Sequence, residues 1–298
     1  MDRQGLYEIY QENLKLLEDE IGQVKKMTQI NLGKLYYERA NTNKQGRIKK
    51  LEYDVLGSTR LYTFLLCSWL EARLKKILYE NSSVAFTDAE RQIVLSGREM
   101  NKKWRNCLNL SVCKSYGFRF CMNQNDYSAN FMNESDAFYY QKVYGYLDDI
   151  EQAITIRNRL AHGQWSRPLN SNCSDLAGQK VYDFLEENDN IQKLDLLYNI
   201  YKIIAEVISS YVVYKDKILT DNFRNDVEKK IQKIDNYWKR IKKCNFDNYC
   251  KPFYKQECLE RECKKSVYKA DSFTDEKPEK KEEISLIEAV HAIVLNEQ

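Results

Sequence analysis

The sequence predicts an all-α protein, on three observations. Only 3 prolines and 10 glycines occur among the 298 residues, so long stretches carry no helix breaker. Hydrophobic residues make up 43% of the chain, and in several segments they recur at helical spacing. No Asn-Gly or Asp-Gly turn separates alternating apolar runs, as a β-hairpin would require. We therefore expect a helical bundle with a sizeable core.

The first part of the chain predicts two long helices. Residues 2–26 place apolar side chains at helical spacing, whereas residues 28–45 give no firm pattern and 41–46 resemble a loop. A long helix is predicted for 47–79. Its central apolar run, 61–70, is too short to span a bilayer and is typical of a buried core helix.

The middle of the chain predicts a capped helix and then an irregular insertion. Thr87 with Glu90 forms a capping-box pattern that opens a helix toward Trp104. Residues 106–136 are rich in Asn, Ser and Cys without a clean period, which indicates an irregular insertion. A helix resumes near Asp136, with an apolar stripe formed by Val143, Tyr146, Leu147, Ile150, Ile154 and Ala161.

Gly163 and Pro168 are expected to end that helix, and residues 164–178 to form a polar loop. Further helices are predicted for about 189–215 and 222–243. Residues 271–283 form a charged linker of disordered type, and a short amphipathic helix follows to the end of the chain.

Composition bounds the class of protein without naming a function. Lys and Arg number 47 against 44 Asp and Glu, and the net charge of +3 permits an RNA partner without requiring one. The N-terminal residues lack the apolar core of a secretion signal. The 9 cysteines are an odd number, which favours reduced thiols in a cytoplasmic protein over a disulfide framework, and no membrane partner is expected.

The candidate site lies in residues 156–165, IRNRLAHGQW. Arg157 continues the apolar stripe, and an arginine there is costly unless an anion meets it. Asn158 and His162 are four residues apart and share an adjacent face of the helix end. The three side chains are therefore predicted to converge at one end of one helix.

These residue types suit cleavage of an RNA phosphodiester. The neighbouring 2′-hydroxyl can act as the nucleophile, so the reaction needs no metal or other cofactor. His162 can transfer a proton near neutral pH, and Arg157 can hold the phosphate and stabilise its charge. Asn158 can orient the histidine or donate to a phosphate oxygen. One site supplies one histidine where the reaction needs a base and an acid, which favours a two-fold homodimer.

Arg157-Asn158-x3-His162 resembles the Arg-x(4–6)-His motif of the HEPN superfamily, including the common Asn after the Arg. The late position at a helix end fits that superfamily, and residues 68–79 resemble its opening helices more loosely. The resemblance implies a HEPN-like domain at 47–215 with an insertion at about 106–136. Residues 1–46 would be a helical extension, 216–270 a charged helical segment, and 271–298 the linker and tail helix.

The resemblance also implies an activity. Active HEPN proteins are metal-independent ribonucleases, usually dimers with a shared cleft, and often toxins or antiviral defence effectors. We therefore expect Arg157, Asn158 and His162 to be catalytic, with RNA as substrate and an antitoxin or sensor subunit as a further partner. Arg159 and Trp165 are weaker candidates for contacting the RNA.

Other interpretations stay open. Arg157 can pair with a buried acid while His162 caps the helix, as in an inactive HEPN-like module that binds RNA or assembles a defence complex. Arg159 is more typical of a solvated helix position than of an RNA contact, and Trp165 is more typical of a loop anchor. Glu71 can orient Arg157 or His162, or face solvent. The cysteines at 244–263 lack the spacing of a zinc site, and His291 fits a packing or surface position.

Overall fold

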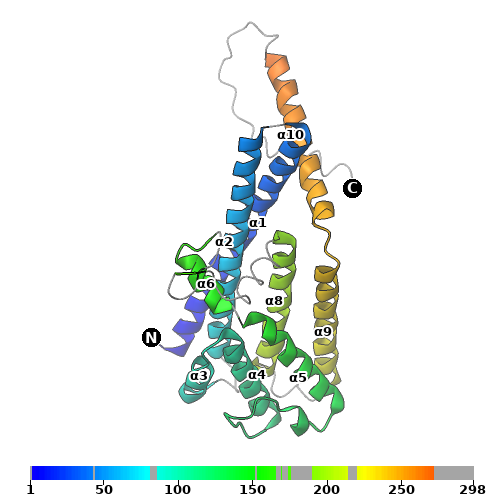
Figure 1. Ribbon diagram of the computed structural model, residues 1–298. Helices are drawn as coiled ribbons and strands as arrows, with labels where there is room; N and C mark the ends of the chain where they lie inside the picture. The colour runs from blue at the N-terminus through cyan, green and yellow to red at the C-terminus, as the bar shows by residue number, and fades with distance from the viewer. Residues whose placement is uncertain are drawn as a thin grey trace. The chain divides into compact units, whose positions relative to one another are not determined.

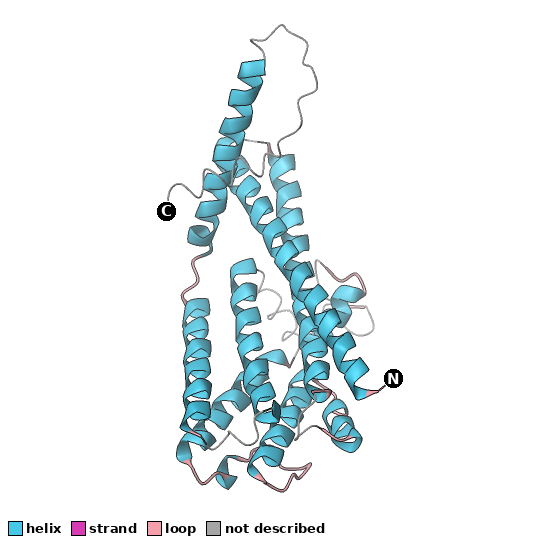
Figure 2. Cartoon of the chain, turned by 180° about the vertical axis from the view of Figure 1, so that it is seen from behind, coloured by secondary structure: helices cyan, strands magenta, loops and turns pink. Residues whose placement is uncertain are grey.

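The computed structural model describes residues 2–42, 44–80, 86–151, 153–165, 169, 174–175, 190–213 and 220–271, without the side chains of 149, 154 and 266–271. Within these ranges the chain is all-α, as predicted, and Figure 2 shows helices joined by loops without a strand. The predicted linker at 272–283, the tail helix and His291 lie outside the described residues. The chain divides into two compact units, residues 1–255 and 256–298. The domain boundaries expected at 46, 215 and 270 remain predictions.

Two long helices form one side of the first unit (Figure 1). α1 (Arg3–Asn41) begins at Asp2, whose side chain accepts a hydrogen bond from the Gly5 N–H at 2.8 Å. It continues through residues 28–41, where no firm helical pattern is evident in the sequence, because Leu32 and Leu35 are buried. α2 (Gln45–Leu78) packs along it and agrees with the helix predicted at 47–79.

α3 (Asp88–Leu95) begins at the predicted capping box, in which the Thr87 hydroxyl and the Glu90 carboxylate each accept from the other's backbone N–H. It ends earlier than expected, and a tight turn through Gly97 leads into α4 (Met100–Tyr116). A Cβ at Gly97 would lie 2.9 Å from the backbone nitrogen of Lys103, so the turn requires glycine.

The insertion predicted at 106–136 is wrong for its first third. α4 runs on to Tyr116 because Leu108, Leu110 and Val112 are buried despite their polar neighbours. Irregular chain begins only at Gly117, whose φ of 75° ends the helix, and it includes one short 3-10 helix, η1 (Ser128–Asn130).

The single helix predicted from Asp136 onward is interrupted. α5 (Glu134–Tyr146) passes into a 3-10 turn, η2 (Leu147–Ile150), and α6 (Ala153–Ala161) follows. A 3-10 turn advances by a different angle per residue, so the apolar stripe shifts across the break. Ile156 and Leu160 are buried in α6, whereas Ala161, predicted on the stripe, is exposed.

The core gathers around α8 (Ile191–Val213), which contacts α2, α4 and α9 (Asp221–Lys242). Trp69 of α2 meets Tyr198 of α8 edge to face at 5.3 Å between ring centroids. By length and composition alone α8 could cross a membrane, but 72% of its apolar window is buried inside the protein. That burial is typical of a core helix, so the feature is weak evidence for a membrane span.

α10 (Phe246–Asp271) begins in the first unit, where its first turns meet α1. A Cβ at Gly33 would lie 2.6 Å from the carbonyl oxygen of Phe253, so the two backbones approach as closely as glycine permits. The Tyr36 hydroxyl donates to Asp247 at 2.6 Å, and the Gln29 amide donates to the Tyr249 hydroxyl at 2.9 Å.

Candidate functional site

The candidate site is built on α6, which packs against α2 (Figure 1). Ile156 and Leu160, spaced one turn apart, are 0% and 1% exposed and fix the rotation of the short helix about its axis. With that face buried, Arg157 is left half-buried at the edge of the contact, and Asn158 is exposed.

His162 lies directly after the last residue of α6, in a Schellman motif. The Gln164 N–H donates to the Arg159 carbonyl at 3.0 Å, and the Gly163 N–H donates to the Leu160 carbonyl at 3.1 Å. Gly163 has the left-handed φ of 79° that this motif needs. The sequence prediction that the helix ends at Gly163 is therefore confirmed, and the motif fixes the backbone of His162.

Arg157 meets an anion, as its place on the stripe required. Its guanidinium forms an ion pair with Glu71 of α2, and it donates to the side-chain oxygen of Asn158 at 3.0 Å through Nη2. The second carboxylate oxygen of Glu71 lies 3.1 Å from Nζ of Lys75. Two cations thus share one carboxylate, and the cluster carries a net positive charge.

The electrostatics of Glu71 favour its ionised form. Partial burial opposes ionisation, but the hydrogen bond from Lys75 and the charges of Lys75, Arg157 and Lys103 outweigh it and lower the pKa of the carboxyl. Lys103 belongs to α4, so cations from three helices face this carboxylate.

An open groove of about 470 Å³ lies beside the cluster. Arg157, Glu71 and Lys75 form one wall, and Tyr10, Asn13 and Leu17 of α1 line it from the other side. The groove therefore combines two cations, Arg157 and Lys75, with two carboxylates, Glu71 and Glu20. The cations, the aromatic ring and the amide are groups that suit a phosphate and its attached base.

The structure brings Arg157 and Asn158 together, but His162 stands apart from them. The imidazole is exposed, and in the described part of the chain it makes no hydrogen bond with Arg157, Asn158 or Glu71. The His162 backbone N–H donates to the Asn158 carbonyl at 3.0 Å, as the helix requires. The predicted convergence of all three side chains is thus seen for two of them within one chain.

The two weaker candidates flank the helix end. Arg159 is half-buried rather than fully solvated, and its guanidinium donates to the Gln164 side chain at 3.3 Å. That same oxygen accepts the Leu169 N–H at 2.7 Å, so Arg159 helps to order the turn. Trp165 is 37% exposed, which leaves part of its ring open to solvent.

The cysteine near the cluster, Cys67, is a buried thiol. Burial raises the pKa of the Cys67 thiol to about 12, although the charge of Arg157 opposes this, so the thiol stays protonated near neutral pH. All cysteines in the described ranges are free thiols. Among those same residues, no three His, Cys, Asp or Glu side chains gather as metal ligands.

Sequence reasoning found Arg157 and left Glu71 open between two roles, but it missed Lys75 and Lys103. The i, i+4 spacing of Glu71 and Lys75 was the available signal for that pair. Lys103 offered none, because its approach to Glu71 depends on how α4 packs. Comparison of the chain with protein-family models, curated proteins and solved structures finds no match.

Proposed function

We propose that the protein is a metal-independent endoribonuclease of HEPN type, with its site at Arg157, Asn158 and His162. The observation that carries the proposal is the positive cluster around Arg157, in the middle of α6, which lies beside an open groove, with His162 exposed directly after the last residue of the helix. Such a cluster can hold a phosphate, and an exposed imidazole can exchange protons with solvent and substrate.

In this mechanism the RNA phosphate lies against Arg157, and Asn158 keeps the guanidinium in place through its side-chain oxygen. His162 removes the proton from the 2′-hydroxyl, or protonates the leaving 5′-oxygen. The 2′-oxygen attacks phosphorus and the bond to the 5′-oxygen breaks, which leaves a 2′,3′-cyclic phosphate and a 5′-hydroxyl. DNA lacks the nucleophile and is spared.

Both proton transfers are needed, and one chain supplies one suitable histidine. We therefore include a homodimer in the proposal, in which a second copy of His162 completes the cleft. A toxin or antiviral effector with such a site would be restrained by an antitoxin or triggered by a sensor subunit.

The first test is cleavage of total cellular RNA in EDTA by the parent and by His162→Ala. His291→Ala is the matched control, because the chain has only 2 histidines and this variant removes the other one. Cleavage by the parent and the control, but not by His162→Ala, supports the proposal. Equal cleavage by all three indicates a contaminating nuclease and contradicts it.

A second candidate is a non-catalytic helical module that binds RNA or assembles a defence complex. The ion pair between Arg157 and Glu71 favours it, because a guanidinium already paired with a carboxylate is less free to bind phosphate. The same experiment separates the two, since a binding module keeps its affinity for RNA in His162→Ala and cleaves nothing in either form.

A further inference from the structure

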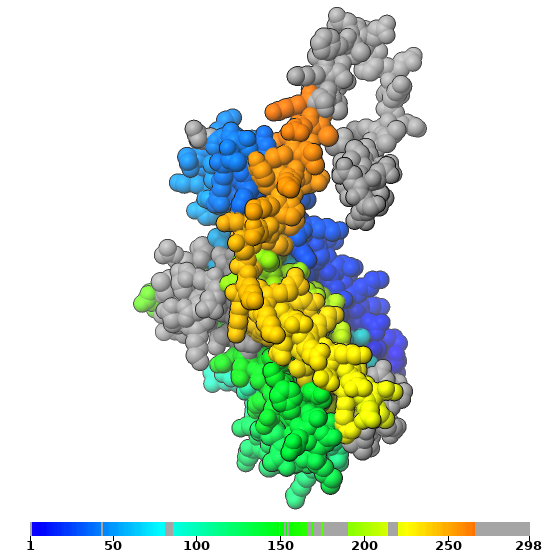
Figure 3. All heavy atoms as spheres, turned by 90° about the vertical axis from the view of Figure 1, so that its right-hand side faces the viewer, coloured from blue at the N-terminus to red at the C-terminus, as the bar shows by residue number. Residues whose placement is uncertain are grey.

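A cationic stripe runs along the outer face of α9. Lys229, Lys233 and Arg240 of α9 and Lys243, its C-cap residue, follow one another at intervals of four, seven and three residues, so they share one face of the helix. All four side chains are exposed. With 1.5 Å of rise per residue, the stripe is about 21 Å long. In Figure 3 α9, in yellow, lies open on the face toward the viewer.

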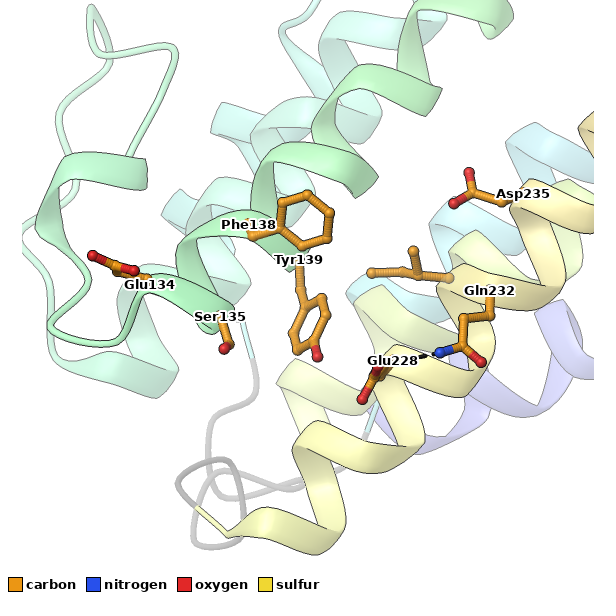
Figure 4. A pocket seen from close by; sticks show the side chains of 8 residues that line it. Glu134, Ser135, Phe138, Tyr139, Glu228, Gln232 and Asp235 are labelled. Atoms are coloured by element: carbon orange, nitrogen blue, oxygen red, sulfur yellow. Dashed lines mark hydrogen bonds between the residues drawn. The ribbon is translucent and has the colours of Figure 1, made fainter.

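Two of the acids of α9, Glu228 and Asp235, lie away from the stripe. Glu228 and Asp235 line a cavity of about 370 Å³ against α5, where Figure 4 shows them beside Phe138 and Tyr139. Asp235 is already engaged there, by the Tyr146 hydroxyl and by Lys142 at 3.5 Å. These two carboxylates therefore face α5, whereas the stripe cations face outward.

The stripe cations have no acidic partners within the described ranges. Asp226, the nearest acid on that side, pairs with Lys230 at 2.7 Å, which lies off the stripe. Arg240 stacks over the Tyr237 ring at 5.6 Å and forms no ion pair among the residues described. Four positive charges therefore lie in a row without acidic partners among the described residues, an arrangement that attracts a polyanion.

The apolar face of α9 argues against insertion of this helix into a lipid bilayer. Phe223, Val227, Ile231 and Ile234 are buried against the core. An amphipathic helix that enters a lipid surface must offer its apolar face to the bilayer, and here that face is occupied. A nucleic-acid backbone requires only the charges.

We propose that the stripe Lys229, Lys233, Arg240 and Lys243 binds the phosphate backbone of a single RNA strand. The choice of RNA over another polyanion rests on the proposed function. The stripe is a second contact, separate from Arg157, and it holds the strand without reading its sequence.

The test uses the full chain with His162→Ala, so that RNA stays intact, and a fluorescent oligouridine in EDTA. The stripe variant replaces Lys229, Lys233, Arg240 and Lys243 by Gln. The control replaces four other exposed cations of the first two helices and the turn between them by Gln: Lys26, Lys44, Lys49 and Lys50. Both variants lose the same net charge, and glutamine keeps the helix propensity of lysine.

We expect the stripe variant to bind at least about tenfold more weakly, and the slope of log affinity against log salt to fall by about 3, or 0.7 for each cation. The control should change little in either measure. Equal losses in the two variants would overturn the proposal. So would unchanged RNA binding with lost binding to phosphatidylserine vesicles, which would assign the stripe to lipid.

A dinucleotide substrate tests the ribonuclease proposal without the stripe, because its single phosphate cannot lie at Arg157 and on the stripe at the same time. With His162 restored, the stripe variant should cleave a dinucleotide at the parent's rate. If the parent cleaves nothing while the stripe still governs binding, the ribonuclease proposal fails and the stripe stands.

Discussion

Arg157 of α6 and Glu71 of α2, 86 residues apart in the chain, form an ion pair at the edge of an open groove. The side chains are 30% and 25% exposed, so the pair is partly shielded from solvent. It explains how an arginine is accommodated at the edge of the buried face of α6: the carboxylate supplies the anion that a half-buried guanidinium requires. It also fixes α6 to α2, and so the position of His162.

The contribution of ionised Glu71 to the free energy of unfolding should depend on pH. Its pKa is lowered in the fold, because Lys75, Arg157 and Lys103 outweigh the opposing effect of burial. Between the folded and unfolded pKa values the unfolded state binds more protons, so stability rises with pH across that window. The contribution is full above the ordinary carboxyl pKa and is lost as pH falls through the lower, folded value.

The measurement is urea unfolding of the parent and Glu71→Gln over a range of pH. The difference in free energy of unfolding should be largest near neutral pH and should shrink as Glu71 becomes protonated in acid. Glu12→Gln, at an exposed position of α1, should show no such trend. A difference for Glu71→Gln that stays constant with pH would contradict the assignment.

The positive φ of Gly163 predicts that alanine at this position lowers stability. Alanine at a φ of 79° is strained, so Gly163→Ala should cost about 1 kcal/mol and disturb the turn that holds His162. Gly57→Ala is the control, because it lies inside α2 and its Cβ would meet nothing within 4 Å. That change should be neutral or stabilise by up to about 1 kcal/mol. Equal changes in the thermal unfolding temperature for Gly163→Ala and Gly57→Ala would argue against the Schellman motif.

The ion pair between Asp136 and Arg224 lies away from the site, and breaking it should strongly lower the free energy of unfolding. Arg224 of α9 donates two hydrogen bonds, at 2.9 and 3.2 Å, to a carboxylate that is only 4% exposed. Arg224→Ala leaves this buried charge unpaired and should destabilise the fold by about 3 kcal/mol. Lys230→Ala breaks the more exposed pair with Asp226 and should cost about 0.5 kcal/mol. Similar shifts in the denaturant midpoint of the two variants would contradict the claim that the buried ion pair contributes more stability than the exposed one.

The proposed cleft between two subunits predicts that one defective subunit strongly lowers the rate of cleavage. If two copies of His162 serve one cleft, a purified heterodimer of the parent and His162→Ala should cleave RNA far more slowly than half the parent rate. Two tags allow its isolation, and light scattering confirms the mass. A rate of half would show independent sites, and a monomeric mass would remove the dimer from the mechanism.

The sequence predicted the helical class, the capping box at Thr87 and the helix end at Gly163, because each depends on local chemistry. The sequence prediction was wrong where tertiary packing determines the structure. The polar composition of 106–116 hid buried apolar positions in α4, and the 3-10 turn after Tyr146 shifted the stripe. The sequence analysis named Glu71 as a possible partner of Arg157 but left its role open, because Glu71 approaches Arg157 only when α6 packs on α2.

The most direct test of the ribonuclease proposal is cleavage, in EDTA, of an RNA oligonucleotide and of its match with a single 2′-deoxy substitution at the cleaved position. The proposal predicts that the parent cuts the all-ribose strand to a 2′,3′-cyclic phosphate, leaves the deoxy match intact at that position, and loses the activity in His162→Ala. Equal cleavage of both strands, or an activity that survives in His162→Ala, would contradict it.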